Sequence, residues 1–167
     1  VMGRCAGGFA EFALMDAREA VPVPARLAWE EAAAIPLVFM VVHDMLIAQG
    51  RLRAGEWLLV TGASSGVGVA AVQVGKLLGA RVIGTVSTEE KAKLAREAGA
   101  DEVILYTEED FLTEVKRITG GVGVQVAYDS VGKDTFDKSL DSLAPLGYMV
   151  SYGQSSGFPA PLDIQRL

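Results

Sequence analysis

The sequence predicts an α/β protein built on a doubly wound parallel sheet. Five apolar, β-branched runs recur along the chain, and helix-like stretches separate them. Continuous runs of this kind are typical of strands that are buried on both faces of a parallel sheet. The glycine-rich segment 61–68 joins the first run to a helix, as in folds that bind dinucleotides. The chain has 167 residues, half of them hydrophobic, which is enough for one domain with a core.

Strands and helices alternate regularly from Trp57 onward. Strands are predicted over 57–61, 81–86, 102–106, 124–129 and 148–152, and helices over 66–79, 89–98, 108–118 and 133–143. Ser87 and Glu90 fit a capping box at the start of the second helix, and Thr107 is a candidate cap for the third. The doubly wound dinucleotide fold usually has six strands, so five strands lead us to expect missing material at both ends.

Residues 1–25 differ from the rest and are predicted to be the tail of a preceding domain and its linker. A glycine turn and a short alternating strand are expected over 7–14, and Pro22 and Pro24 punctuate the linker. Residues 26–167 are predicted to form the dinucleotide-binding domain.

Two helices are predicted ahead of the first strand. The first is short and covers 29–34; the second is a longer buried helix over 37–49, with Pro36 favouring its first turn. The longest apolar run, 37–42, is too short to span a bilayer, and the N-terminus carries no signal pattern, so we expect no membrane partner. His43 follows this run and is expected to be a packed helix residue.

Composition argues against several functional classes. The net charge is −6 and no long Lys/Arg cluster exists, so nucleic acid is not an expected partner. Cys5 and His43 are the only cysteine and histidine, so no internal disulfide can form, and we expect no metal. A single cysteine is compatible with a reducing compartment, and a cytoplasmic location is expected.

Three chemistries fit the glycine-rich turn, and the first is a serine nucleophile. Residues 62–66 match the G-x-S-x-G elbow of α/β-hydrolases. In that fold the histidine that activates the serine follows it in the chain, whereas His43 precedes the turn. The sequence therefore argues strongly against a hydrolase.

The second chemistry is that of the short-chain dehydrogenases, whose T-G-x-x-x-G-x-G turn also fits segment 61–68. That family uses a tyrosine four residues before a lysine. The residues four positions after the tyrosines of this chain are Asp110, Gly132, Tyr152 and Ser156. The chain also contains no asparagine, so the asparagine-rich segment of that family is impossible.

A third family accounts for nearly the whole chain. The motifs that carry the resemblance cover residues 7–12, 29–36, 63–73, 79–86, 99–101 and 128–132, in that order. With them the chain resembles the medium-chain dehydrogenase/reductase superfamily, and within it the zinc-independent NADPH:quinone oxidoreductase (zeta-crystallin-like) family. The resemblance implies a GroES-like β domain, of which residues 1–25 are a remnant, followed by a Rossmann cofactor domain that lacks its last strand.

The resemblance implies NADPH as the cofactor and indicates which residues would bind it. Ser65, Gly66, Val67 and Gly68 would lie against the pyrophosphate, because small residues and a helix N-terminus suit a close anion. Ala63 and Ser65 stand where a strict G-x-G-x-x-G motif has its first two glycines, so the chain departs from that pattern.

Ser87, Lys91 and Tyr106 match positions that the family uses for NADPH. Ser87 ends the second strand, where NAD enzymes place a carboxylate for the ribose, and a small residue there leaves room for a 2′-phosphate. Lys91 would supply positive charge, whereas Glu89 and Glu90 add negative charge nearby. The alternative is that Ser87 is only a helix cap and Lys91 only a solvated charge.

Two loops at the carboxyl ends of the fourth and fifth strands are expected near the nicotinamide half of the cofactor. They contain Ser130, Val131, Gly153, Gln154, Ser155 and Ser156. Ligands bind at this edge of open α/β sheets; flexible loops without a ligand are the alternative. Asp129 is expected to be structural, because no second carboxylate or base is spaced to act with it.

The predicted function is hydride transfer from NADPH to a small-molecule substrate, a quinone or an activated alkene, with this chain supplying the cofactor-binding part. One alternative is an enoyl or alkenal reductase of the same superfamily; another is a non-catalytic NADPH-binding module. No catalytic residue is assigned, because groups that protonate the substrate would come largely from the absent domain. The full-length protein is expected to be a homodimer.

Overall fold

A computed structural model describes residues 1–166; Leu167, the last residue of the expected cofactor domain, lies outside the described residues. The chain divides into two compact units, Val1–Val41 and Val42–Leu167. The domain boundary expected near residue 25 remains a prediction, because compactness alone does not say which residues belong to which domain.

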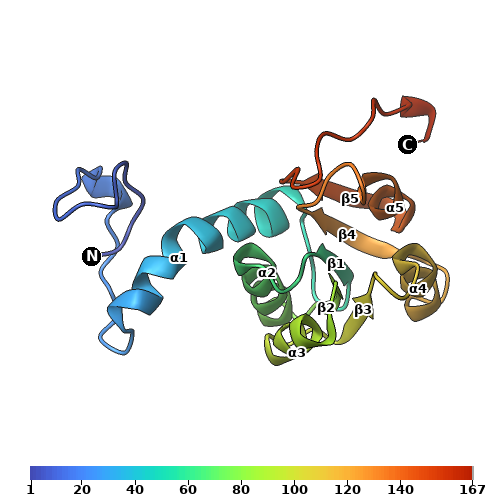
Figure 1. Ribbon diagram of the computed structural model, residues 1–167, viewed down its shortest axis with the longest axis horizontal. Helices are drawn as coiled ribbons and strands as arrows, with labels where there is room; N and C mark the ends of the chain where they lie inside the picture. The colour runs from blue at the N-terminus through green and yellow to red at the C-terminus, as the bar shows by residue number, and fades with distance from the viewer. Residues whose placement is uncertain (167) are drawn as a thin grey trace. The chain divides into compact units, whose positions relative to one another are not determined.

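The second unit contains one parallel sheet. Its strands are β1 (Trp57–Thr61), β2 (Arg81–Val86), β3 (Glu102–Leu105), β4 (Val124–Asp129) and β5 (Leu143–Ser151). Their order across the sheet is β3-β2-β1-β4-β5, and every neighbouring pair is parallel. The chain thus builds outward from β1 in one direction and then returns to its other side, which confirms the doubly wound fold (Figure 1).

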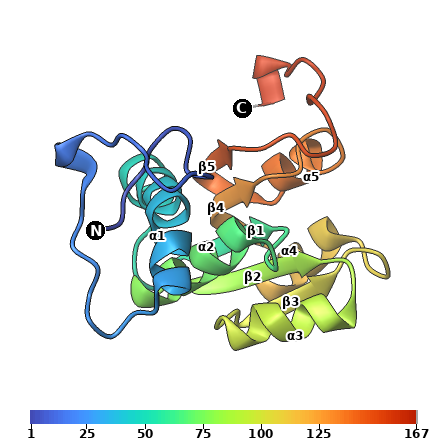
Figure 2. The ribbon, with the colours of Figure 1, turned by 60° about the vertical axis from the view of Figure 1, so that its left-hand side comes forward.

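Helices cover both faces of this sheet, with α2 and α3 on one side and α4 and α5 on the other (Figures 1 and 2). They are α2 (Gly66–Leu77), α3 (Glu89–Glu97), α4 (Phe111–Ile118) and α5 (Phe136–Asp141). The helix α2 lies very close to the sheet at Gly75, where an added Cβ would be 2.9 Å from Leu58 and 3.1 Å from Val82. A larger residue there would push the helix away from the strands.

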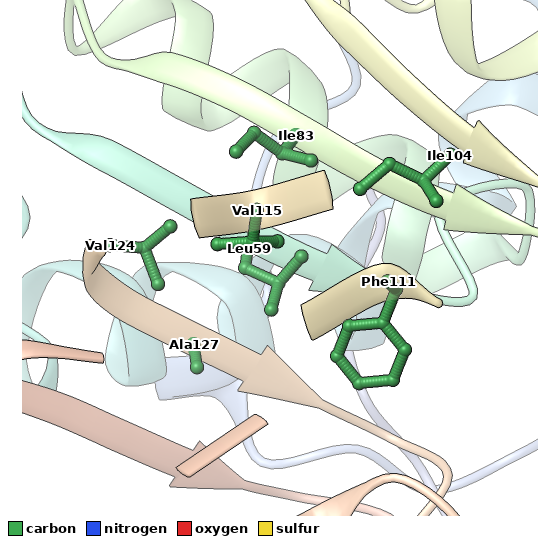
Figure 3. Close-up of a cluster of buried hydrophobic side chains, with 7 residues drawn as sticks. All are labelled: Leu59, Ile83, Ile104, Phe111, Val115, Val124 and Ala127. Carbon is green, nitrogen blue, oxygen red and sulfur yellow. The ribbon is translucent and has the colours of Figure 1, made fainter. Parts of the chain in front are cut away.

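The core between the sheet and α4 is a cluster of aliphatic side chains and one aromatic ring (Figure 3). Its members are Leu59, Ile83, Ile104, Phe111, Val115, Val124 and Ala127, none more than 5% exposed. Fully burying a side chain of this size stabilises a fold by about 1.5–3 kcal/mol relative to leaving it exposed. The cluster therefore makes the central strands a rigid support for the loops at their carboxyl ends.

The first unit has little regular structure apart from its helix. Met2 and Val21 form a single antiparallel bridge, and the 3₁₀ turn η1 (Ala17–Glu19) lies between them in the chain. The strand expected over 7–14 is wrong: that segment pairs with no other described residue, and its apolar side chains Phe9, Phe12 and Leu14 are exposed. An alternating pattern forms a strand only where a partner edge is available.

The helices ahead of β1 also differ from the expectation. One continuous helix, α1 (Trp29–Val42), includes Pro36, and the π-helical segment η2 (His43–Gln49) follows it directly. Pro36 removes one backbone hydrogen bond without ending the helix, so the predicted break was wrong. His43 is exposed rather than packed.

Residues 29–49 are together long and apolar enough to cross a membrane by length and composition alone. A single helix of this kind is weak evidence, since a core helix of a soluble protein passes the same test. The expectation of no membrane partner therefore stays a prediction.

Two helix caps lie one to three residues later than predicted. Thr88, not Ser87, caps α3 and accepts the Lys91 N–H at 3.3 Å, because its backbone is extended. Asp110, not Thr107, caps α4. The last strand begins at Leu143 instead of 148, across a register shift between β4 and β5.

Candidate cofactor-binding site

The candidate site lies where the winding of the sheet reverses, between β1 and β4. The chain runs from β1 to β2 and β3 on one side and returns to β4 and β5 on the other, so loops leave the carboxyl ends of β1 and β4 in opposite directions. A crevice at this reversal is the usual ligand position in open α/β sheets.

The glycine turn after β1 is shaped by backbone conformation and close packing. Gly62 has φ +65°, in the left-handed region that favours glycine. Ser65 caps α2 by accepting the Gly68 N–H at 3.0 Å. A Cβ at Gly68 would lie 2.3 Å from the Gly62 carbonyl oxygen and 2.9 Å from the Ala63 backbone, so Gly68 is required by the fold itself.

Gly66 differs from Gly68, because a Cβ there would meet nothing within 4 Å. Its φ is not positive either, so neither the local fold nor the backbone requires glycine at this position. Gly66 and Val67 begin α2, where backbone N–H groups have no carbonyl partner within the helix and attract anions. Open space in front of an N-terminal glycine therefore fits close approach of a pyrophosphate.

The predicted 2′-phosphate residues come together at the ends of β2 and β3. The Lys91 ammonium donates a hydrogen bond to the Ser87 hydroxyl at 3.0 Å, so it lies over the strand end. Thr107 Oγ1 donates to the Ser87 carbonyl at 3.1 Å, and the Tyr106 N–H donates to the Val86 carbonyl at 3.1 Å. The Tyr106 side chain is half-exposed.

The loops after β4 and β5 pack tightly on each other. The Ser155 N–H donates to the Ser130 carbonyl at 3.3 Å, and the Ser156 N–H and hydroxyl donate to the Val131 carbonyl at 2.9 and 2.8 Å. A Cβ at Gly153 would lie 2.5 Å from the Ser130 carbonyl oxygen. These contacts bring the predicted loop residues together. Gln154 and Ser155 are the exposed members of the group, and the Gln154 carbonyl accepts the Gly157 N–H at 2.9 Å.

Two hydrogen bonds connect this loop pair to β1. The Ser130 N–H donates to Thr61 Oγ1 at 3.1 Å, and the Ser130 hydroxyl donates to the Thr61 carbonyl at 3.3 Å. The carboxyl ends of β1 and β4 are thereby fixed relative to each other.

Asp129 is fully buried and has a structural role, as expected. Its Oδ1 accepts the N–H groups of Val131 and Gly132 and the Thr135 hydroxyl at 2.9–3.0 Å, and its Oδ2 accepts the Ser139 hydroxyl at 2.6 Å. With four donors bound to it, this carboxylate orders the loop after β4.

Sequence reasoning missed an aromatic pair at the same edge. Tyr152, directly after β5, stacks on Tyr128 of β4 with ring centroids 4.1 Å apart. The Tyr152 hydroxyl is buried and makes no hydrogen bond among the described residues. Burial is the main cause that raises the pKa of Tyr152, and the Asp129 charge adds to the rise. Two tyrosines near the ends of adjacent predicted strands were the available signal.

The described part of the chain, residues 1–166, contains no group of three or more His, Cys, Asp or Glu side chains that could hold a metal ion. The expectation that the protein is zinc-independent applies to the whole protein and not only to these residues, so it stays a prediction.

Residues 66–167 match the family of zinc-binding dehydrogenases. The chain is 44% identical over 151 residues to quinone oxidoreductase 1 of Escherichia coli strain K12, covering 90% of this chain and 46% of that protein. It is 40% identical over 160 residues to a 2-haloacrylate reductase of a Burkholderia species, covering 95% and 48%. A solved structure of the Escherichia coli quinone oxidoreductase complexed with NADPH superimposes with a TM-score of 0.82 at 44% identity, covering 88% of this chain and 45% of that one.

The chain therefore belongs to the zinc-binding dehydrogenase family, within the medium-chain dehydrogenase/reductase superfamily expected from the sequence. Its relatives include quinone oxidoreductases, which are enzymes. The chain spans about half the length of the curated relatives it matches, 46% and 48% for the two named above.

Proposed function

We propose that this chain is the cofactor-binding part of an NADPH-dependent oxidoreductase that reduces a quinone. The observation that supports the proposal is that two candidate phosphate sites, the open turn at Gly66 and the Ser87–Lys91 pair, lie at the carboxyl ends of the strands. The chain is also 44% identical to a quinone oxidoreductase solved with NADPH. The residues present fit the cofactor, because each of its two phosphate regions has a suitable group.

The proposed roles follow the positions of the residues along the edge. Ser65, Gly66, Val67 and Gly68 would hold the pyrophosphate through backbone N–H groups at the start of α2. Lys91 would neutralise the 2′-phosphate, and Ser87 and Tyr106 would border it.

The loops after β4 and β5 would border the nicotinamide half. The residues proposed for this role are Ser130, Val131, Gly153, Gln154, Ser155 and Ser156. Their mutual hydrogen bonds make the loops preformed, so they can orient a ring without first becoming ordered.

NADPH supplies the hydride when it is bound, and the chain's own residues bind and orient it. No proton donor is proposed among the residues of this chain. Among the described residues, no carboxylate at the carboxyl ends of the strands has a second acid or base beside it, and Asp129 is occupied by four hydrogen-bond donors.

A second candidate function is reduction of an activated alkene. The 40% identity to a 2-haloacrylate reductase favours it, because a 2-haloacrylate is an activated alkene and not a quinone. The same cofactor part would serve either acceptor, and the residues that discriminate them would contact the substrate.

Steady-state NADPH oxidation by the intact protein, with quinones and with enones as acceptors, tests both candidates. Faster turnover with quinones supports the first and faster turnover with enones the second. No oxidation of NADPH by either class, together with tight NADPH binding, would favour a non-catalytic binding module and contradict both.

We also propose a homodimeric, cytoplasmic whole protein with a GroES-like domain before this one. The length of the relatives, about twice that of the chain, supports the further domain, and the lone, exposed cysteine suits a reducing compartment. The dimer is what the family resemblance implies. Sedimentation of the intact protein tests the dimer; a monomer at working concentrations would refute it.

A further inference from the structure

We propose that Arg96 is a specificity-determining residue that favours NADPH over NADH by neutralising Glu89 at the start of α3. The inference rests on the proposed function, since it concerns how the 2′-phosphate is recognised. It starts from a difficulty in the sequence: two glutamates stand beside the residues expected to bind a phosphate.

The first turn of α3 carries opposing charges. Glu89 and Glu90 occupy its first two positions, where carboxylates suit the positive end of the helix dipole. The same carboxylates would repel a 2′-phosphate bound between Ser87 and Lys91. A site with both glutamates unpaired would therefore bind NADPH less tightly than one with a single free carboxylate.

The structure pairs one of the two glutamates. Arg96 lies seven residues after Glu89, two helical turns along the same face, and its guanidinium is 2.5 Å from the Glu89 carboxylate. The arginine side chain thus extends back along α3 to its first turn. Glu90 has no hydrogen bond or ion pair among the described residues, so the pairing is specific to Glu89.

Lys91 takes no part in this pair. The Lys91 ammonium contacts the Ser87 hydroxyl and neither glutamate. Residues two apart on a helix do not face each other, so without Arg96 the unpaired Glu89 would act on a phosphate near Lys91 through its negative charge in the same turn, not by contact with the ammonium. Arg96 therefore acts through Glu89, as a positioning and charge-balancing residue rather than as a phosphate ligand.

The test measures binding of NADPH and NADH to the intact protein by quenching of protein fluorescence, without substrate. Arg96→Ala is expected to weaken NADPH binding about two- to fivefold and to leave NADH unchanged, a size typical of one screened surface charge. Arg96→Ala combined with Glu89→Gln is expected to restore NADPH binding, because the carboxylate that Arg96 neutralises is gone. The effect is expected to shrink at 0.5 M salt.

Lys93→Ala is the matched control, because Lys93 is on the same helix and its carboxylate partner is Glu97, 3.9 Å away at the far end. This variant is expected to bind both cofactors as the unmodified protein does. An Arg96→Ala variant with unchanged NADPH affinity, or a double variant that stays as weak as Arg96→Ala, would overturn the inference.

The outcome for Lys91→Ala separates this inference from the proposed function. If Lys91→Ala loses the preference for NADPH and Arg96→Ala keeps it, only the inference fails. If the unmodified protein binds NADPH and NADH equally, the proposed choice of cofactor fails as well.

Discussion

Two glycines of one turn, Gly66 and Gly68, are expected to respond in opposite ways to the same substitution. At Gly68 an added methyl group would lie 2.3 Å from the Gly62 carbonyl oxygen, whereas ordinary contacts begin near 3.4 Å. The backbone would have to move by about 1 Å, and overpacking of this kind costs about 1–3 kcal/mol. For a chain of this size the midpoint of thermal unfolding would fall by roughly 2–4 °C per kcal/mol.

Gly66→Ala is the matched variant, because its methyl group would meet nothing within 4 Å. Alanine is a better helix former than glycine, by up to about 1 kcal/mol, so stability should stay equal or rise. The methyl group would nevertheless enter the space where a pyrophosphate approaches the backbone. We expect NADPH binding to weaken at least about tenfold, which corresponds to about 1.4 kcal/mol.

The assay is thermal unfolding followed by circular dichroism, with NADPH titration of each variant at a temperature where it is folded. Gly66→Ala that binds NADPH as the unmodified protein does would refute the turn as a pyrophosphate site. Gly68→Ala with an unchanged unfolding midpoint would refute the packing argument. Both results together would mean that this turn is an ordinary connection from strand to helix.

Four further predictions concern the carboxyl ends of the strands and the start of α4. Lys91→Ala should raise the Kd for NADPH about tenfold and leave NADH unchanged in fluorescence titration, because one charge-assisted contact is lost. Tyr152→Phe should leave the free energy of urea unfolding unchanged or raise it by about 1 kcal/mol, because it removes a buried hydroxyl without a partner; a loss above that size would contradict the reasoning. Asp129→Asn should cost about 1–3 kcal/mol in the same measurement, because an amide cannot accept four donors. The pKa of Asp110 is lowered to about 2, mainly by the Lys138 hydrogen bond. The stabilisation that its carboxylate provides is therefore present above pH 4 and is lost as the pH falls toward 2. In Asp110→Asn the free energy of unfolding should depend less on pH in that range.

The sequence predicts the central sheet well, because buried strands leave a strong apolar pattern. The bounds of β1, β2 and β4 agree with the predicted runs. The start of β5 was missed: its first half contains Pro145 and Gly147, residues that usually mark loops, and Leu146 with a positive φ. This half of the strand lies in the register shift between the Val124–Leu143 and Val126–Tyr148 pairs, and such irregularities tolerate proline and glycine.

Helix boundaries were less predictable, because neighbouring residues compete for the same role. Ser87 and Thr88 both carry hydroxyls that can cap a helix, and only the backbone conformation decides between them. In the same way, Pro36 permits either a new helix or a continuation with one missing hydrogen bond.

The sequence also predicts only part of the candidate site. The glycine turn and the loop residues follow from strand ends, which a sequence pattern can locate. The Arg96–Glu89 pair and the Tyr128–Tyr152 stack depend on side-chain directions across two helical turns or between strands, and these directions are set by packing.

The double link between Thr61 and Ser130 makes the carboxyl ends of β1 and β4 one cooperative unit. The amide proton of Ser130 is bonded to a hydroxyl that is itself fully buried, so it should exchange with solvent only when the sheet unfolds. A cofactor that binds beside these strand ends meets a surface with little left to order. Its binding should accordingly change hydrogen exchange at the more exposed loop tips and hardly at all along the junction of β1 and β4.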